Sequence, residues 1–139
     1  MQSIRPIICR LEIRLVLPGG TSLQVLCDLR YDAHDPWAVR MSFHTGGESD
    51  DVVEWLFARA LLTDGVRANT GAGDVRVWPG DGNRADIVHL AMTSPSGSAL
   101  FEVARAPLVA FLESTYLAVP TGAEGRVVDL DRELAELLG

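Results

Sequence analysis

The stretch at residues 70–80, TGAGDVRVWPG, combines glycines with an Asp and an Arg and therefore raises the possibility of a phosphate-binding loop. A dinucleotide-binding loop needs a third glycine where Arg76 stands, and it needs a helix directly after the loop. A P-loop ends in Lys followed by Ser or Thr, and the chain contains no Lys. Strand-like runs flank the glycines, so the stretch is predicted to be a tight β-turn, which Asp74 supports by accepting backbone N–H groups.

Other residues with reactive side chains lack the spacing of a catalytic or metal site. Asp32, His34 and Asp35 share one turn and could contact a metal, but their spacing matches no zinc-ligand pattern, and turn formation accounts for them. Ser96 lies in SPSGS, which is not a nucleophile elbow. His89 lies in a strand context and is interpreted as a satisfied, partly buried histidine. The chain is therefore predicted to have no catalytic residues, no metal and no cofactor.

Size and charge narrow the classes of partner. The chain has 139 residues, 47% of them hydrophobic, which suits one domain with a substantial core over residues 1–139. Its net charge of −7 disfavours binding to nucleic-acid backbones and anionic lipid. No stretch approaches the roughly 20 apolar residues of a membrane span, and no segment resembles a signal peptide. We therefore expect a cytoplasmic protein.

Two cysteines, Cys9 and Cys27, could form a disulfide in principle. If Gly19 and Gly20 form a two-residue hairpin turn, facing residues have numbers that sum to about 39, which places the cysteines on opposite faces of the ribbon. The preferred interpretation is two free thiols in a reducing compartment.

The elements that position these residues follow from hydrophobic periodicity. Alternation predicts strands, with Trp37 among the residues that point inward on the third, and a 3.6-residue period predicts helices. The last helix is predicted to begin with Asp129 as its N-cap. The predicted strands are 11–17, 23–29, 37–43, 52–57, 86–92 and 99–103, and the predicted helices are 58–62, 107–117 and 129–138. Short connections make the strands antiparallel, so the fold class is α+β, an antiparallel sheet packed with helices.

Five long stretches carry a resemblance to a known family, in the same order over nearly the whole chain. They are LRYDAHDPWAVRMSFHTG (29–46), VEWLFARALLTDG (53–65), TGAGDVRVWP (70–79), SPSGSALFEV (94–103) and DLDRELAELL (129–138). These motifs resemble the SsgA-like proteins of sporulating actinobacteria, and the resemblance implies a single SsgA-like domain.

The resemblance implies a non-enzymatic protein of sporulation-specific cell division. It implies recruitment of the tubulin-like FtsZ to future septum sites with the help of an SsgA-type paralogue, and promotion of FtsZ polymerisation. It also implies a Whirly-like fold, a curved antiparallel sheet or partial barrel with a C-terminal helix, assembled as a homotrimer. We therefore expect the protein at the division septum, with membrane attachment only through a partner.

Whirly-like folds bind single-stranded nucleic acid, which is the alternative function. Such a binder would need a local arginine cluster, for example Arg40, Arg76 and Arg84 on one face. Exposed tryptophans could stack on bases, but core packing is the preferred interpretation because no basic residues are interleaved with them. A ligand-binding or catalytic domain would instead need a polar pocket with perturbed ionisable groups.

The C-terminal helix is the predicted partner-binding surface. Leu130, Leu134, Leu137 and Leu138 form a wide apolar stripe at the end of the chain. The alternative is that this stripe docks on its own sheet or on a neighbouring subunit.

Overall fold

One antiparallel sheet organises the molecule. The structure is a computed structural model that describes residues 5–44, 46 and 51–138. The strands are β1 (Ile7–Val16), β2 (Ser22–Tyr31), β3 (Ala38–His44), β4 (Val52–Ala58), β5 (Thr70–Ala72), β6 (Val75–Pro79), β7 (Ile87–Ser94) and β8 (Gly97–Ala104). The helices are α1 (Arg59–Gly65), α2 (Arg105–Ala118) and α3 (Glu124–Leu138), with a 3₁₀ turn η1 (Gly82–Arg84).

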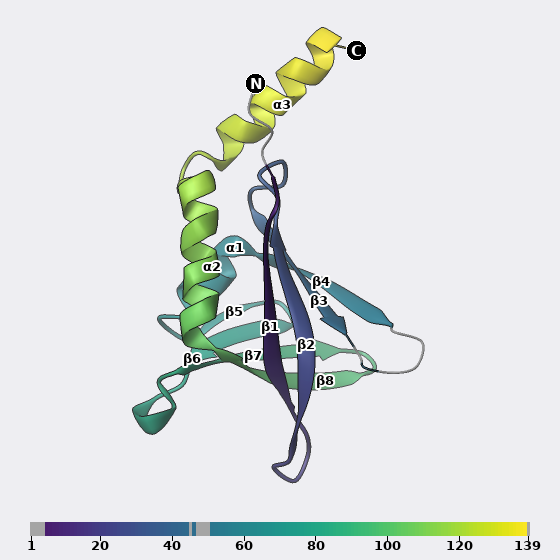
Figure 1. Ribbon diagram of the computed structural model, residues 1–139, viewed down its shortest axis with the longest axis vertical. Coiled ribbons are helices and arrows are strands. Elements are labelled where there is room, and N and C mark those ends of the chain that lie inside the picture. Colours follow the sequence, from purple (N-terminus) through teal and green to yellow (C-terminus); the bar gives the residue numbers. More distant parts are fainter. Residues whose placement is uncertain (1–4, 45, 47–50, 139) are drawn as a thin grey trace.

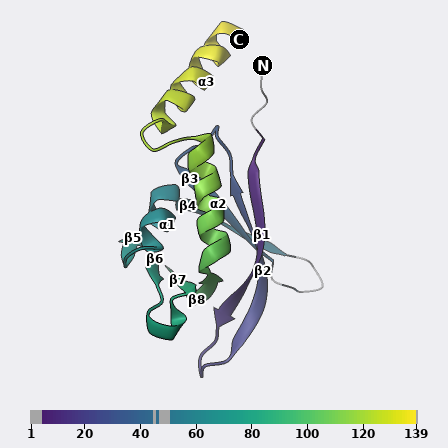
Figure 2. The same ribbon diagram turned by 60° about the vertical axis from the view of Figure 1, so that its left-hand side comes forward.

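The strand order is β4-β3-β2-β1-β8-β7-β6-β5, so two four-stranded meanders meet where β1 pairs with β8. Figure 1 shows that the sheet curls, with its two halves running in different directions. Helix α1 connects the two edge strands, β4 and β5. Helix α2 lies along the hollow between the halves (Figure 2). The predicted α+β fold, a curved antiparallel sheet forming a half-barrel with helices, is confirmed.

Alternating side chains build the core as predicted. On β3, Val39, Met41 and Phe43 point inward and are buried. Trp37 does not follow them, because β3 begins at Ala38 and the side chain of Trp37 is 53% exposed. The prediction that Trp37 points inward is wrong, since this residue still belongs to the preceding turn, where the strand alternation does not apply.

The β1–β2 hairpin differs from the two-residue turn predicted for it. Leu17 N–H donates to the carbonyl of Thr21 at 2.7 Å, so the loop includes Pro18 as well as the two glycines. The extra residue shifts the register by one, and Cys9 faces Leu29 while Leu11 faces Cys27. Both cysteines therefore lie on the same face, and the prediction of opposite faces is wrong. Both are free thiols.

The glycine-rich stretch at residues 70–80 forms the β5–β6 hairpin. Ala72 pairs with Val75, which leaves Gly73 and Asp74 as the turn, and Gly73 has a φ of 60° that favours glycine. The predicted tight turn is confirmed. Asp74 contributes its main-chain carbonyl, which accepts the N–H of Thr93 at 2.9 Å, and its carboxylate has no hydrogen-bond partner among the described residues.

Two helices follow β8. Helix α2 buries Leu108, Phe111 and Leu112, as its 3.6-residue period predicts. Helix α3 begins at Glu124, so Asp129 lies inside it and the predicted N-cap is wrong. The helix starts early because the carboxylate of Glu124 accepts the N–H of Gly122 at 2.9 Å. Among the described residues, no helix is long and apolar enough to cross a membrane.

Candidate interaction surfaces

Helix α3 carries the leucine stripe predicted to bind a partner. No residue of this helix is buried, and it extends away from the sheet (Figures 1 and 2). The exposed fractions are 56% for Leu130, 37% for Leu134, 82% for Leu137 and 84% for Leu138. The stripe therefore does not dock on the sheet of its own chain.

A buried arginine holds the base of α3. Arg59, at the start of α1, is 2% exposed. Its guanidinium donates to the carbonyls of Thr115 at 3.1 Å and Val119 at 2.8 Å, at the end of α2. It also pairs with the carboxylate of Glu124 at 2.7 Å, in the first turn of α3. One side chain thus joins three helices, and it donates to two carbonyls at a helix end, of which that of Thr115 also accepts the N–H of Val119 at 2.9 Å.

Two aromatic rings complete the surroundings of Arg59. The guanidinium carbon lies 3.9 Å from the ring centroid of Tyr116 and 5.0 Å from that of Tyr31. Cation–π contacts of this kind are strongest where water is excluded. Nothing in the sequence marks Arg59 as a buried residue, because an arginine in a short amphipathic helix is ordinarily exposed. No local pattern marks it, since its partners lie far away along the chain.

A second contact holds α3 against the turn between β2 and β3. His34 Nδ1 lies 2.6 Å from the carboxylate of Asp131. The hydrogen bond to Asp131, and then its charge, raise the pKa of His34. Both side chains are substantially exposed, so the contact orients α3 more than it stabilises the protein. His34 is one of the three turn residues that could contact a metal, and in the structure its ring instead contacts the carboxylate of Asp131.

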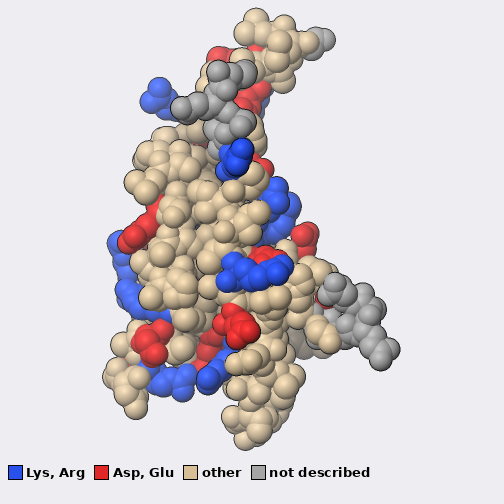
Figure 3. All heavy atoms as spheres, viewed as in Figure 1, with Lys and Arg blue, Asp and Glu red and all other residues tan. Residues whose placement is uncertain are grey.

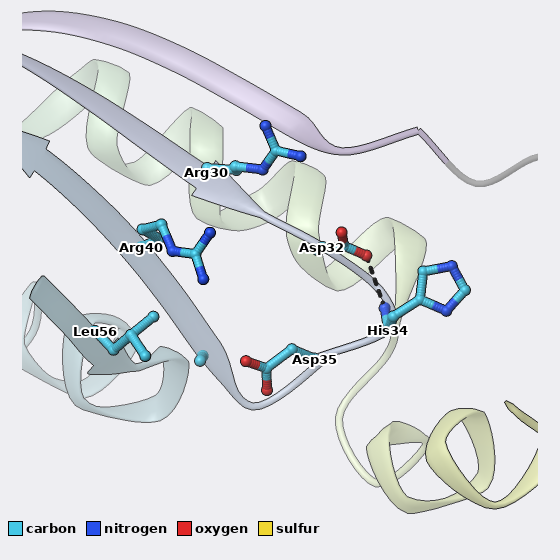
Figure 4. Close-up of a pocket in the computed structure, with 7 residues that line it drawn as sticks. Arg30, Asp32, His34, Asp35, Arg40 and Leu56 are labelled. Carbon is cyan, nitrogen blue, oxygen red and sulfur yellow. Dashed lines mark hydrogen bonds between the residues drawn. The ribbon is translucent and has the colours of Figure 1, made fainter. Parts of the chain in front are cut away.

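A shallow hollow of about 180 Å³ lies beside this contact (Figure 4). Arg30 and Arg40 face each other across β2 and β3, and Asp32 and Asp35 follow in the adjoining turn. Asp32 accepts the backbone N–H of His34 at 2.9 Å, which is the turn role predicted for it. The hollow is lined by Arg30, Asp32, His34, Asp35, Ala38, Arg40 and Leu56.

Among the described residues, the two arginines in this hollow have no partner of opposite charge. Neither Arg30 nor Arg40 forms an ion pair or hydrogen bond within the described part of the chain, and both are exposed. Like charges directly opposite each other in a sheet destabilise it by up to about 1 kcal/mol. The pair is therefore suited to an acidic group from outside the chain.

The outer face also carries a satisfied ionic cluster. Asp28 accepts from Arg10 at 2.8 Å and from His44 at 2.9 Å. The hydrogen bond from Arg10, helped by His44, lowers the pKa of Asp28 to about 2 against the opposing effect of burial. The charges in this cluster neutralise one another, as expected of a structural network on a sheet surface.

The three arginines that a nucleic-acid binder would need on one face, Arg40, Arg76 and Arg84, do not lie together. Arg76 donates to Asn69 at 2.8 Å, and Arg84 pairs with Glu102. Arg40 lies on β3, in the other half of the sheet from β6, which carries Arg76. The local cluster that a nucleic-acid binder would need is therefore missing among these three residues.

Metal-binding side chains do not gather elsewhere in the described part of the chain. Within residues 5–44, 46 and 51–138, no group of three or more His, Cys, Asp and Glu side chains could hold a metal ion. His89 stacks on Trp78, with ring centroids 5.1 Å apart, and its buried Nδ1 has no hydrogen-bond partner among the residues that the structure describes. The interpretation of His89 as satisfied is therefore wrong.

A second, larger groove lies on the inner side of the sheet. Its volume is about 660 Å³, and its walls come from β1, β2, β3, β4, β7 and β8. Most of the side chains that line it are apolar, including Leu15, Phe43, Trp55 and Phe101. The chain thus offers three surfaces: the α3 stripe, the arginine-lined hollow and this apolar groove.

These features define a class of protein, a curled antiparallel half-barrel with an exposed C-terminal amphipathic helix. A family model described as "Streptomyces sporulation and cell division protein, SsgA" matches residues 25–124. The chain is 51% identical to "Sporulation-specific cell division protein SsgB" of Frankia casuarinae, over 95% of this chain and 91% of that protein. It is 48% identical to the protein of the same name from Streptomyces coelicolor, over 94% and 93%.

Solved structures agree with these relatives. The SsgA-like sporulation-specific cell division protein from Thermobifida fusca superposes with a TM-score of 0.88 at 41% identity, over 98% of both chains. A structure reported as "Mutations in SsgB correlate to longitudinal cell division during sporulation of Streptomyces coelicolor" gives a TM-score of 0.83 at 45% identity, over 91% of this chain and 98% of that one. The chain belongs to the SsgA family, and its role lies in sporulation-specific cell division.

Proposed function

We propose that this chain is a non-catalytic binding protein that recruits FtsZ to future septum sites and promotes its polymerisation. The relatives named for sporulation-specific cell division support a place in septation. The observation that carries the proposal is the exposed leucine stripe of α3, on a helix anchored by the buried Arg59. An amphipathic helix presented in this way suits a hydrophobic groove on a partner.

The mechanism is multivalent binding. A homotrimer with a Whirly-like fold presents several copies of α3, and each copy holds one FtsZ subunit weakly. Linked sites raise the overall avidity without new contacts, which favours longer filaments at one location. An SsgA-type paralogue positions the trimer, and attachment to the membrane comes through a partner. The protein acts in the cytoplasm, at the division septum.

Co-sedimentation with FtsZ filaments tests the proposal. The wild-type protein is expected to pellet with filaments, and the combined variant Leu130→Ala, Leu134→Ala and Leu137→Ala is expected to bind at least about tenfold more weakly. Alanine is a good helix former, so α3 stays helical and only the apolar contact is lost. Leu117→Ala is the matched control, because this leucine on α2 is 85% exposed and lies outside the stripe.

Two outcomes contradict parts of this proposal. If the wild-type protein stays in the supernatant at every salt concentration and stoichiometry, direct recruitment is wrong. If it pellets and the triple variant pellets equally well, recruitment stands and α3 is not the contact.

A further inference from the structure

The two edges of the sheet differ in length and exposure. The edge strand β5 has three residues, and the edge strand β4 has seven. Proteins ordinarily protect an open edge by making it short or by placing Lys or Pro in it. The described residues of β4 have neither, and their one charged residue is Glu54. An unprotected edge of this kind favours pairing with another strand.

The hydrogen bonds of β4 alternate in direction along the strand. Arg59 N–H donates to the carbonyl of Trp37 at 2.7 Å, which is a hydrogen-bonded pair at the end of the β3–β4 ladder. In an antiparallel ladder every second residue is paired in this way. Trp55 and the other odd-numbered residues therefore bond to β3, whereas Glu54 and Leu56 point their N–H and C=O groups outward. In the described part of the chain, no backbone group pairs with them.

Both faces of β4 expose apolar side chains beside this open edge. On the outer face, Val52 is 45% exposed and Leu56 is 60% exposed. On the inner face, Val53 is 46% exposed, and it borders the apolar groove together with Trp55. A strand added to β4 would cover these side chains, because successive residues of a strand alternate between the two faces.

Charge distinguishes the outer face from the inner one. Leu56 pairs with Arg40, and Arg40 pairs with Arg30, so the three side chains form one row across neighbouring strands (Figure 4). Asp32 and Asp35 border the same hollow, but no ion pair joins them to the arginines. A carboxylate on an added strand would extend this row, since adjacent strands lie about 4.8 Å apart and an arginine side chain spans more than one strand.

We propose that the edge of β4 binds an extended segment of a partner protein as an additional strand. Its side chains toward the outer face are carboxylates that reach Arg40, with Arg30 behind it adding positive charge, and those toward the inner face are apolar and cover Val53 and Trp55. This surface is separate from the α3 stripe, and the proposal does not depend on FtsZ being the partner.

A second copy of the chain fits this edge less well. In a symmetric β4–β4 pair, each copy would bring one carboxylate, that of Glu54, to the outer face of the joint. Glu54 already accepts a hydrogen bond from Ser42 Oγ at 3.3 Å. The positive charges of Arg30 and Arg40 in each copy would then outnumber the carboxylates near them. A segment with more acidic side chains is therefore the better match.

Peptide binding to the full chain tests this proposal. The probe is a fluorescent, end-capped peptide of alternating valine and glutamate, and the matched probe carries lysine in place of glutamate. Fluorescence anisotropy should show that the glutamate peptide binds at least about tenfold more tightly, with an advantage that shrinks as salt rises. Arg30→Gln combined with Arg40→Gln should abolish the preference for glutamate. No measurable binding of the glutamate peptide, or equal binding of both peptides, overturns the proposal.

Leu56→Pro tests the backbone contact. Proline removes the outward N–H of Leu56 but no bond to β3, and edge strands tolerate proline at such positions. This variant should bind the glutamate peptide at least about tenfold more weakly, whereas Leu56→Ala, which keeps the N–H, should stay within about threefold of wild type. Equal binding by the proline variant and wild type overturns the proposal.

Amide hydrogen exchange gives a measurement that needs no variant. In the free protein the amides of Glu54 and Leu56 should exchange much faster than that of Trp55, and the peptide should slow exchange at those two positions. Unchanged exchange at Glu54 and Leu56 overturns the proposal. Sedimentation velocity tests whether a second copy of the chain occupies the edge of β4. If Leu56→Pro dissociates an oligomer, the edge binds a second copy and the partner-strand proposal is wrong.

Discussion

Replacing Arg59 with alanine should destabilise this protein more than replacing any exposed arginine. The side chain is almost fully buried and donates to Glu124 and to two carbonyls at the end of α2. Alanine would leave the carbonyl of Val119 without this donor and that of Thr115 with only the N–H of Val119, open a cavity between two tyrosine rings and free the first turn of α3. Arg67, an exposed residue just after α1, provides a matched control.

The expected magnitude follows from these contacts. Removing one partner of a buried ion pair costs about 3–5 kcal/mol, since the remaining groups lose their hydrogen bonds in a site with little water. For 139 residues, the entropy of unfolding is about 0.3 kcal/mol per kelvin, so the midpoint should fall by about 10–17 °C. Arg67→Ala should change the free energy of unfolding by less than about 0.5 kcal/mol.

Urea unfolding and thermal melts followed by circular dichroism measure both variants against wild type. Arg59→Ala should also speed amide exchange in α3, because that helix loses its anchor. A loss below about 1 kcal/mol, similar to that of the control, would refute the view that this guanidinium joins the three helices.

Three further predictions concern pH, packing and thiol reactivity. The pKa of His34 is raised by Asp131, so this contact stabilises fully below the unfolded histidine pKa of about 6.5 and is lost as pH rises through the folded value. The protection factors of the amides in α3, which correct the measured exchange for the pH dependence of its intrinsic rate, should therefore rise on acidification from pH 8 to 6, and they should rise less in His34→Gln. Gly65→Ala places a methyl group against a buried valine of β6 and should lower the free energy of unfolding by about 1–3 kcal/mol. Gly125→Ala meets open space in α3 and should raise the free energy of unfolding by up to about 1 kcal/mol. Urea unfolding measures both changes. Burial raises the pKa of Cys27 to about 12, so a thiol reagent at pH 8 should label this residue only after unfolding, and rapid labelling of the native protein would contradict its burial.

The strand pattern could be predicted because one face of the sheet is buried. Ile13, Val39 and Met41 alternate with polar residues, and such alternation has few other structural solutions. Loop length at the first hairpin could not be predicted in the same way. One additional loop residue shifts the register of the two strands by one residue. The prediction of a two-residue loop therefore placed Cys9 and Cys27 on opposite faces, whereas they share one face.

The start of a helix is also hard to predict from sequence where it depends on tertiary contacts. The stripe of α2 was found from its period, but the start of α3 was placed at Asp129 because an aspartate before a leucine-rich run is a common N-cap. The actual start depends on Glu124, which bonds both the N–H of Gly122 and the distant Arg59. Contacts between residues far apart in the chain leave no local signature, and this is why the anchor of the proposed binding helix was missed.

Helix α3 is fixed at its first turn by Arg59 and held further along by the exposed His34–Asp131 contact, so loss of the second contact would leave the helix free to tilt about its base. Its 15 residues span roughly 22 Å at 1.5 Å per residue. A tilt of about 10° at the first turn would therefore move the far end of the helix by about 4 Å, which is less than the roughly 5.4 Å pitch of one helical turn. In the proposed multimer, such a tilt would let the leucines near the end of each α3 reach targets that are not evenly spaced.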